Sequence, residues 1–546
     1  MKKGIALVCM LFVGVISFGQ SLNLEWSDKI EYKKENGFLN QLIGESDNYI
    51  YANIYDYKTK LLDDNSKSNI KCKLIAYNKS TKKEELAVNL MGFPDTKTSE
   101  KVYSNLEYYK SVIQNNVMYV FWYSQQTVSM LKSELYCQTF DLTLKPLQPL
   151  KKICELPCNE YKVKDPAFII CTNPTRENII IVSESSATEA TQNKNYKIEI
   201  RTINPNLAIT KNINLEVPYS SKSDEILPIY GDYSQLNDGN LFIKAQKNFL
   251  IINPTLNKKL TLGNKIEGKL IMSLKSYTEN NVTKYIGTYI TKETENLSEK
   301  KSGIFTFEID ETLFKPSKVN FIEFNQEQLN TLYPKLDKKE AYILFGNNKT
   351  DKNLMNYEID ELINSNGKLI LFATKTLVQN NTFTNSQTGS STYTYIYKDD
   401  IVPIVFSNNA IEKFMTPIKR TTSYVDVISS DDMFSLNTNS HSFLIFGWDV
   451  KDTKRIFGVG ADDDEVEMKH NRLYYWVTNH ETGQTEINFI HVNNKKSKNF
   501  EEKFFTPEKH EFQGVDNFYY LGSTVLTLMG NDGKKPKFIG QLSITK

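Results

Sequence analysis

The tetrapeptide FDLT, residues 140–143, ends a run of strand-forming residues and is followed by a second such run. Asparagine and aspartate suit a turn here, because their side chains can hydrogen-bond the backbone two residues on and tolerate left-handed geometry. Similar tetrapeptides recur along the chain: YNKS at 77, INPN at 203, INPT at 252, IDET at 309, FSNN at 406 and VNNK at 492. The turn therefore marks a structural unit that is repeated at irregular spacings of 49 to 97 residues.

The segments around these turns read as strands. Runs rich in Val, Ile, Tyr and Phe, bounded by Asn, Asp, Gly and Ser, recur throughout, for example at 49–57, 117–123, 178–183, 368–374 and 442–448. A strand ends before nearly every turn, a second follows most of them, and another lies upstream. Repeated four-stranded meanders of this kind are typical of a β-propeller. We therefore predict an all-β protein with a propeller architecture.

The two ends of the chain predict how the ring closes. After residue 511 only about three strands remain, so the last unit lacks its fourth strand. A spare strand, LNLEWSDKIEY at 22–32, precedes the first complete unit. Pairing between these N- and C-terminal strands would leave no open sheet edge. This predicts eight four-stranded blades, with seven as the alternative.

The chain is expected to form a single propeller domain over residues 21–546. The exception to its strand pattern lies near 325–355, where a helical or irregular insertion is expected. Within it, residues 326–339 place Leu329, Leu332, Tyr333 and Leu336 on one helical face.

Residues 1–20 have the features of a secretory signal peptide. Lys2 and Lys3 precede an apolar run over residues 4–18, which ends in the small-residue pattern Ser17-Phe18-Gly19. This run is too short to span a bilayer comfortably, and no other stretch is long enough. We therefore expect an exported protein without membrane insertion, in the periplasm, at the cell surface or outside the cell.

The charge balance limits the kinds of binding partner, and the cysteine spacing limits the disulfide and zinc sites that the chain can form. The 66 basic and 65 acidic residues balance, which gives no field that favours nucleic acid. Cys154 and Cys158, in ICELPC, could form a local disulfide in an oxidising compartment or remain two buried thiols. A zinc site is disfavoured, because no second cysteine pair has suitable spacing.

Two segments carry a family resemblance: NYEIDELINSNGKLILFATKT at 356–376 and YKDDIVPIVFSNNAIEKFMTPIKR at 397–420. They resemble a poorly characterised family of secreted, propeller-like proteins of Bacteroidota. The resemblance implies the fold and export, and it implies no activity. Members of that family often carry an acid just after the strand at 368–372, where this chain has Ala373, Thr374 and Lys375.

The long polar insertions fall repeatedly between the second and third strands of a unit, at 58–69, 124–132, 186–195, 291–302, 377–392 and 450–469. In a propeller all these loops emerge on one face, which could be elaborated for contact or could merely tolerate drift. Trp122, Tyr123 and Trp448 end second strands, so they are candidates for aromatic contacts on that face. The alternative is that they pack between blades.

The acidic stretch GVGADDDEVEMKH, residues 458–470, lies in the last of these insertions. It does not fit a nucleotide loop, because Asp463 stands where the third glycine belongs. Asp462 and Asp464 could be calcium ligands, but the glycine and the distal acid of an EF-hand are missing. A solvated acidic loop, with no cofactor, is the main interpretation, and an irregular calcium or magnesium site is the alternative.

Motifs for catalysis are missing from the sequence. It contains no G-x-S-x-G, H-E-x-x-H or P-loop lysine motif, and its five histidines all lie at or after position 441. We therefore expect a monomeric binding or scaffolding propeller that contacts a protein or glycan through the loops of one face. The alternative is a propeller-type glycoside hydrolase or lyase that uses carboxylates near the axis.

Overall fold

The computed structural model describes the protein over a set of segments, to which every structural statement below refers. These are residues 21–26, 38–56, 71–90, 106–124, 132–157, 168–172, 177–184, 195–218, 232–236, 240–245, 248–254, 257–263, 265–279, 282–291, 301–310, 312–333, 356–365, 368–385, 389–407, 409–414, 417–418, 422–425, 433–438, 440–446, 474–482, 484–489, 505–513, 517–524 and 538–545. The proposed signal peptide, residues 1–20, lies outside them.

The described strands form eight antiparallel sheets, numbered sheet 1 to sheet 8 in chain order. Sheets 1 to 4 consist of β2 (Phe38–Glu45), β3 (Tyr49–Asp56), β4 (Lys71–Asn78) and β5 (Glu84–Asn89); β6 (Leu106–Gln114), β7 (Val117–Ser124), β8 (Lys132–Asp141) and β9 (Pro146–Pro157); β10 (Phe168–Cys171), β11 (Ile179–Glu184), β12 (Asn195–Ile203) and β13 (Ile209–Pro218); and β14 (Asp232–Gln235), β15 (Leu241–Ala245), β16 (Asn248–Asn253) and β17 (Lys258–Gly263).

Sheets 5 to 8 consist of β18 (Lys265–Ile266), β19 (Lys269–Glu279), β20 (Val282–Ile290), β21 (Ser302–Asp310) and β22 (Lys315–Glu323); β23 (Asn356–Ser365), β24 (Lys368–Asn385), β25 (Gly389–Ser407) and β26 (Ala410–Phe414), with β27 (Thr422–Val425) on β25; β28 (Met433–Asn437), β29 (His441–Phe446), β30 (Tyr474–Asn479) and β31 (Thr485–Phe489); and β32 (Phe505–Gln513), β33 (Asn517–Thr524), β34 (Phe538–Thr545) and β1 (Ser21–Trp26).

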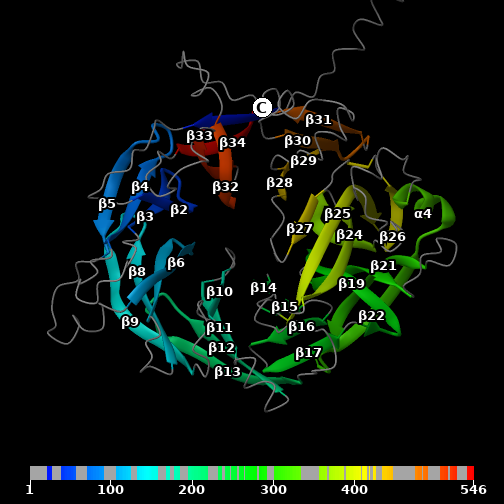
Figure 1. The fold of residues 1–546 in the computed structure, drawn as a ribbon, viewed down its shortest axis with the longest axis horizontal. Helices are drawn as coiled ribbons and strands as arrows, with labels where there is room; N and C mark the ends of the chain where they lie inside the picture. The colour runs from blue at the N-terminus through cyan, green and yellow to red at the C-terminus, as the bar shows by residue number, and fades with distance from the viewer. Residues whose placement is uncertain are drawn as a thin grey trace, which may run out of the picture.

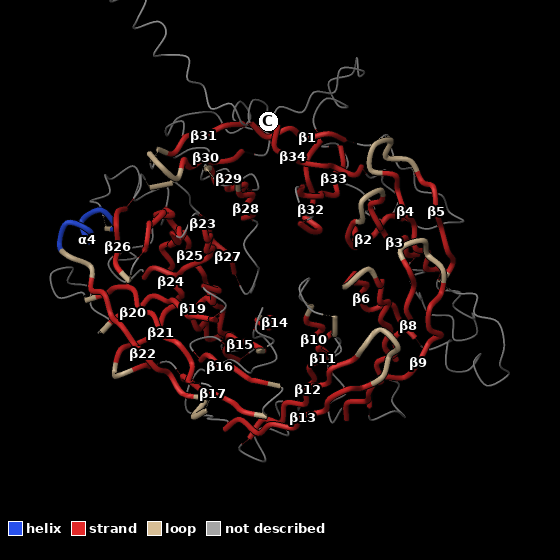
Figure 2. The backbone as a smooth tube through the Cα atoms, turned by 180° about the vertical axis from the view of Figure 1, so that it is seen from behind, coloured by secondary structure: helices blue, strands red, loops and turns tan. Residues whose placement is uncertain are grey.

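The protein is all-β, and its four-stranded antiparallel sheets resemble propeller blades. Figure 1 shows the sheets following one another in chain order around a common centre, and Figure 2 shows the same arrangement from behind. Strands such as β6, β10 and β32 lie nearer the centre, whereas β5, β9 and β13 lie on the rim. Each meander therefore runs outward from its first strand.

Consecutive sheets pack face to face through alternating apolar side chains. In β7, Met118, Val120 and Trp122 join a buried cluster with sheet 1. Tyr119 and Phe121, on the other face of the same strand, join a cluster with sheet 3. Further clusters connect sheet 3 with 4, 4 with 5, 5 with 6, and 6 with 7. Because successive side chains of a strand point to opposite faces, a run of apolar residues supplies both interfaces.

The chain ends meet in sheet 8. β1 pairs antiparallel with β34, from Ser21 opposite Thr545 to Trp26 opposite Gly540. The backbone N–H of Leu22 also donates to the Tyr475 hydroxyl of sheet 7, at 3.3 Å. The strand that the sequence offered as a spare thus supplies the fourth strand of this sheet.

The repeated turns join the third and fourth strands of sheets 1 to 4 and 6, as the sequence pattern indicates. In sheet 5 the two-residue strand β18 precedes the four-stranded meander β19–β22, and the turn joins β21 and β22. The Asp141 Oδ1 accepts hydrogen bonds from the Thr143 and Lys145 N–H groups, at 2.8 and 2.9 Å. Asn78, Asn204 and Asp310 accept backbone N–H bonds in the same way. Most of these turns also contain a residue with positive φ, such as Leu144 or Leu207.

The assignment of VNNK to the turn of sheet 7 was wrong. There the turn follows β30, where Asn479 Oδ1 accepts from the Glu481 and Thr482 N–H groups, both at 2.9 Å. VNNK comes after β31 and lies outside the described residues. This turn does not match the repeated tetrapeptide, because the buried Thr478 precedes Asn479, where the pattern requires an apolar residue.

These turns also connect neighbouring sheets. A lysine on the fourth strand of one sheet donates its Nζ to a backbone carbonyl in the turn of the next sheet. We call each such contact a turn bridge. Among the described residues the turn bridges are Lys151 to Leu207 at 2.9 Å, Lys211 to Pro254 at 3.4 Å, Lys258 to Thr312 at 2.7 Å, and Lys413 to Glu481 at 3.2 Å.

The predicted helix is present and is shorter than expected. α4 (Gln326–Leu332) begins after Asn325, whose side chain accepts the Gln328 N–H in a capping box. The helix ends at Tyr333, because Pro334 disfavours helical geometry at the residue before it. The remainder of the predicted insertion, 334–355, lies outside the described residues.

A buried chain of hydroxyl groups joins sheets 5 and 6. The Thr288 hydroxyl donates to the Tyr357 carbonyl at 2.6 Å, so it accepts from the Ser273 hydroxyl, 2.7 Å away. The Ser273 hydroxyl in turn accepts the Ile359 N–H at 2.9 Å. These contacts fix β23 against β19 and β20.

We expect Thr288→Val to destabilise the protein by about 1–3 kcal/mol, because it removes the buried hydroxyl that donates to the Tyr357 carbonyl and accepts from Ser273. Urea unfolding would measure this loss. Thr278→Val, at an exposed position of the same sheet, is the control and should change stability by less than about 0.5 kcal/mol. Equal midpoints for Thr288→Val and the native protein would contradict the role of the hydroxyl chain.

Candidate binding face

Strand direction divides the connections between two sides of the molecule. Within a meander, the connection from second to third strand leaves one end of the sheet, and the other two hairpin turns leave the opposite end. Five of the six predicted insertions lie in gaps between the second and third strands of a four-stranded meander, after β3, β7, β11, β20 and β29. In sheet 5 this meander begins at β19. We call the side that carries these connections the insertion face.

The sixth insertion is a β-hairpin and not the polar loop that the sequence analysis expected. β24 and β25 continue their pairing beyond the blade, from Thr376 opposite Lys398 to Asn385 opposite Gly389. β27 extends this ladder by pairing with β25 at residues 395–398. Residues 376–397 are rich in Thr, Tyr and Ser and contain no proline, so they can continue a strand ladder. Polarity alone had suggested a loop.

The hairpin is anchored where it leaves the sheet. The ladder shifts register between Thr374 and Thr376, so Lys375 occupies an irregularity and is only 1% exposed. Its Nζ lies 5.4 Å from the ring centre of Tyr333, at the end of α4. Tyr333 packs edge to face on Tyr357, whose hydroxyl donates to the Leu332 carbonyl. Burial raises the pKa of the Tyr333 hydroxyl, so the phenol stays neutral beside the cation.

The predicted aromatic candidates have different surroundings. Trp122 is 4% exposed and contacts Tyr108 edge to face at 5.9 Å, so it packs between sheets 1 and 2. Tyr123 is half-buried and stacks edge to face on Tyr109 at 6.0 Å. It therefore keeps part of its surface at the insertion-face end of β7. Trp448 lies outside the described residues.

The candidate metal ligands lie outside the described segments, and of the two cysteines of the candidate disulfide only Cys154 lies within them. Asp462 and Asp464 are not described, and among the residues that are, no group of three or more His, Cys, Asp or Glu could hold a metal. Cys154 is a free, buried thiol in the cluster between sheets 2 and 3. Burial raises its pKa to about 11, so the thiol is protonated at neutral pH. Cys158 lies outside the described residues.

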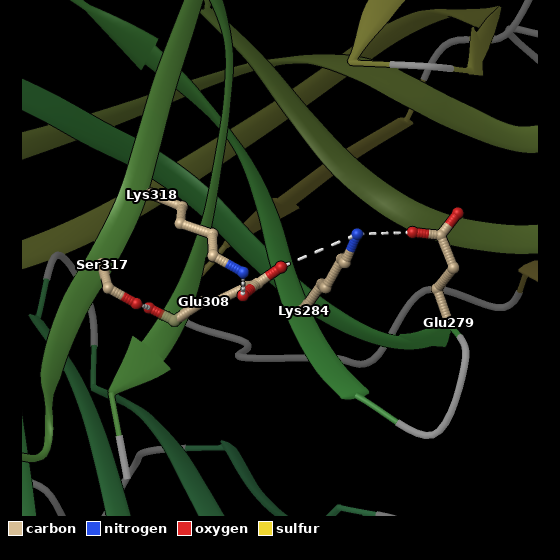
Figure 3. A network of polar contacts seen from close by, with 5 residues as sticks. All are labelled: Glu279, Lys284, Glu308, Ser317 and Lys318. Carbon is tan, nitrogen blue, oxygen red and sulfur yellow. Dashed lines mark hydrogen bonds and ion pairs between the residues drawn. The ribbon is translucent and has the colours of Figure 1, made fainter. Parts of the chain in front are cut away.

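The opposite side of sheet 5 carries an ion-pair network, shown in Figure 3. Lys284 Nζ lies 2.5 Å from a Glu279 oxygen and 3.7 Å from Glu308, and Lys318 Nζ lies 2.6 Å from the other Glu308 oxygen. The hydrogen bond to Glu279 raises the pKa of the Lys284 amine. The cations and carboxylates of this network pair with one another, so its residues suit a control.

Histidine contacts were missed by the sequence analysis. His441 begins β29 and His480 follows β30, so both lie at the turn end of sheet 7. His441 contacts the Ser440 hydroxyl and the Asn479 amide, and His480 contacts the Ser442 hydroxyl. Only the observed register of the hairpin turns brings these two histidines to one end.

Comparisons with known proteins give low similarity. No family model matches the chain, and no curated protein matches it. A similar solved structure is the β-propeller domain of the trilobed protease from Pyrococcus furiosus, with 9% identity, 80% and 93% coverage of the two chains and a TM-score of 0.34. Others are the phage phi92 endosialidase (12%, 96% and 69%, 0.25) and the GH43 endo-arabinanase from Bacillus licheniformis (11%, 53% and 99%, 0.22). At these TM-scores the similarities carry no argument about function.

The search for membrane-spanning helices gives a negative result over the described segments: none of their helices has the length and apolarity to cross a bilayer.

We expect a double-mutant cycle of Lys375→Met and Tyr333→Leu to give a coupling energy of about 1 kcal/mol, as a cation over an aromatic face does. Unfolding free energies of the four proteins measure it. A control cycle combines Lys368→Met with Tyr333→Leu. The Lys368 Nζ pairs with Glu412, so this cycle should give no coupling. Zero coupling in both cycles would show that the ring does not stabilise the buried cation.

Proposed function

We propose that the protein is an exported binding or scaffolding propeller that contacts a protein or glycan of the cell envelope through its insertion face. The observation that carries this proposal is the β24–β25 hairpin, whose pairing runs past the blade as far as Asn385 and Gly389. A connection that only closes the sheet needs about two residues. The additional ladder therefore serves something other than closure.

The composition of the hairpin supports contact with another molecule. Residues 376–397 contain no charged residue, although 24% of the whole chain is charged. Projecting β structure is usually protected from association by charges or proline. An uncharged, hydroxyl- and amide-rich hairpin offers hydrogen-bonding groups without the cost of removing charges from water. A neutral glycan or a polar protein surface suits such a hairpin.

We further infer that the eight sheets are the blades of one closed ring, which acts as a monomer. This is supported by the core clusters between consecutive sheets 1 to 7 and by the contact of Leu22 with Tyr475. It is also supported by the pairing of β1 with β34. A rigid ring would hold the hairpin and the neighbouring connections in fixed relative positions.

Removal of β1 tests the closed ring. A chain that begins at Ser27 should melt at a lower temperature than one that begins at Ser21, because Leu22, which is 8% exposed, no longer packs and the β34 edge is open. It should also self-associate in light scattering. Equal melting temperatures and a monodisperse protein in both cases would refute closure by β1.

Hairpin shortening tests the binding function. Replacing residues 379–395 by Asn-Gly joins Val378 to Ile396, which are register partners, and so keeps the blade intact. The shortened protein should fold normally and lose at least about tenfold in affinity for its partners, found with a glycan array and an envelope-extract pull-down.

The control variant combines Glu279→Gln with Lys284→Met, on the side opposite the insertion face. It should leave partner binding unchanged. Equal binding by the shortened and native proteins would refute the role of the hairpin. Absence of any partner for the native protein in both assays would argue against a binding function.

A further inference from the structure

The turn of sheet 7 contains a titratable group in contact with the residue that holds the turn. Asn479 Oδ1 accepts the backbone N–H groups of Glu481 and Thr482. Since that oxygen is used by the turn, the group that faces His441 is the Asn479 NH2, and its Nδ2 lies 3.2 Å from the His441 Nε2. The orientation of the amide is therefore fixed by the backbone of the turn.

An NH2 group can only donate, so the His441 Nε2 must accept and cannot carry a proton. The proton of the neutral ring then resides on Nδ1, which lies 2.8 Å from the Ser440 hydroxyl. Protonation of His441 would place a second N–H against the Asn479 NH2. Rotation of the Asn479 amide by 180° would remove this clash of two donors. Its NH2 group would then face the N–H groups of Glu481 and Thr482. Either outcome breaks a contact that shapes the turn.

The same turn receives one of the turn bridges. Lys413 of sheet 6 donates its Nζ to the Glu481 carbonyl at 3.2 Å, so a change in the turn moves the acceptor of this bridge. In the bridged turns of sheets 3 and 5, Asn204 and Asp310 hold the backbone through their side-chain oxygens. In the bridge between sheets 6 and 7, the residue that holds the turn contacts the imidazole of His441.

We propose that His441 makes the turn bridge between sheets 6 and 7 sensitive to acid: protonation of its imidazole releases Asn479, loosens the turn and weakens the contact of Lys413 with Glu481. The site is the cluster Ser440, His441 and Asn479, and its ligand is the proton. This inference is independent of the proposed binding function.

The charged surroundings give the sign of the effect. Burial lowers the pKa of His441 from its ordinary 6.5, and the Glu481 carboxylate opposes this shift. The other charged or titratable groups nearby are Lys413, on β26, and His480, at the end of β30. Because the folded state favours the neutral imidazole, stability is fully present above pH about 6.5 and is lost as the pH falls through the folded pKa.

The test is hydrogen exchange of the peptide that covers residues 474–489, at pH 7.5 and pH 5.0, after correction for the intrinsic rates. In the native protein the protection of the turn amides should fall at pH 5.0, on the order of threefold or more. His441→Gln keeps an acceptor that does not titrate, so its protection should be equal at the two pH values.

Asn479→Asp should reverse the response. Aspartate holds the equivalent turns at Asp141 and Asp310, so the turn itself tolerates the change. One carboxylate oxygen can accept the turn N–H groups while the other accepts from a protonated His441, so this variant should be better protected at pH 5.0. The His441 pKa, followed by NMR, should be higher in Asn479→Asp than in the native protein.

His480→Gln is the matched control. His480 Nε2 contacts the Ser442 hydroxyl at 2.7 Å, and a hydroxyl can donate or accept according to the state of the ring. This variant should keep the native pH response. The proposal would be overturned if the native protein showed equal protection at both pH values. It would also be overturned if His441→Gln lost protection as the native protein does, or if Asn479→Asp kept the native sign.

Discussion

A four-stranded sheet with apolar side chains on both faces is stable only when both faces are covered. In β7 the alternation of Val120 and Phe121 commits one side chain to sheet 1 and the next to sheet 3. The same arrangement recurs in sheets 3 to 6, so each of these sheets needs a neighbour on either side. A row of such sheets always leaves two uncovered ends unless it curves until they meet. The order of the sheets around a common centre agrees with this constraint.

The periphery is held by a second, polar set of contacts. An Asn or Asp side chain shapes the turn between the third and fourth strands, and a lysine of the preceding sheet binds a carbonyl of that turn. These contacts are exposed or only partly buried and are individually weak, but they recur at separate places, so their contributions add. In sheet 7 the histidine beside Asn479 connects one of these contacts to the proton concentration.

The candidate face depends on the same framework. A projecting hairpin keeps a fixed direction only if its base is rigid, and here the base contains the buried Lys375 against Tyr333. The aromatic residues of the sequence analysis contribute unequally, because Trp122 fills the core whereas Tyr123 remains half-buried at the strand end. Strand ends are ambiguous in a sequence, since the last aromatic residue of a strand can face a neighbouring sheet or the solvent.

Local signals in the sequence determined the all-β class, the four-stranded repeat, most of its turns, the start of α4 and the terminal strand that pairs with β34. These features depend on side-chain periodicity, on Asn and Asp chemistry and on capping, which act over a few residues. The hairpin at 376–397, the burial of Lys375 and the contact of His441 with the turn at Asn479 were decided by the tertiary structure. Each depends on register and on which sheet lies opposite, because residues such as His441 and Asn479 are 38 positions apart in the chain and meet only when the strands pair.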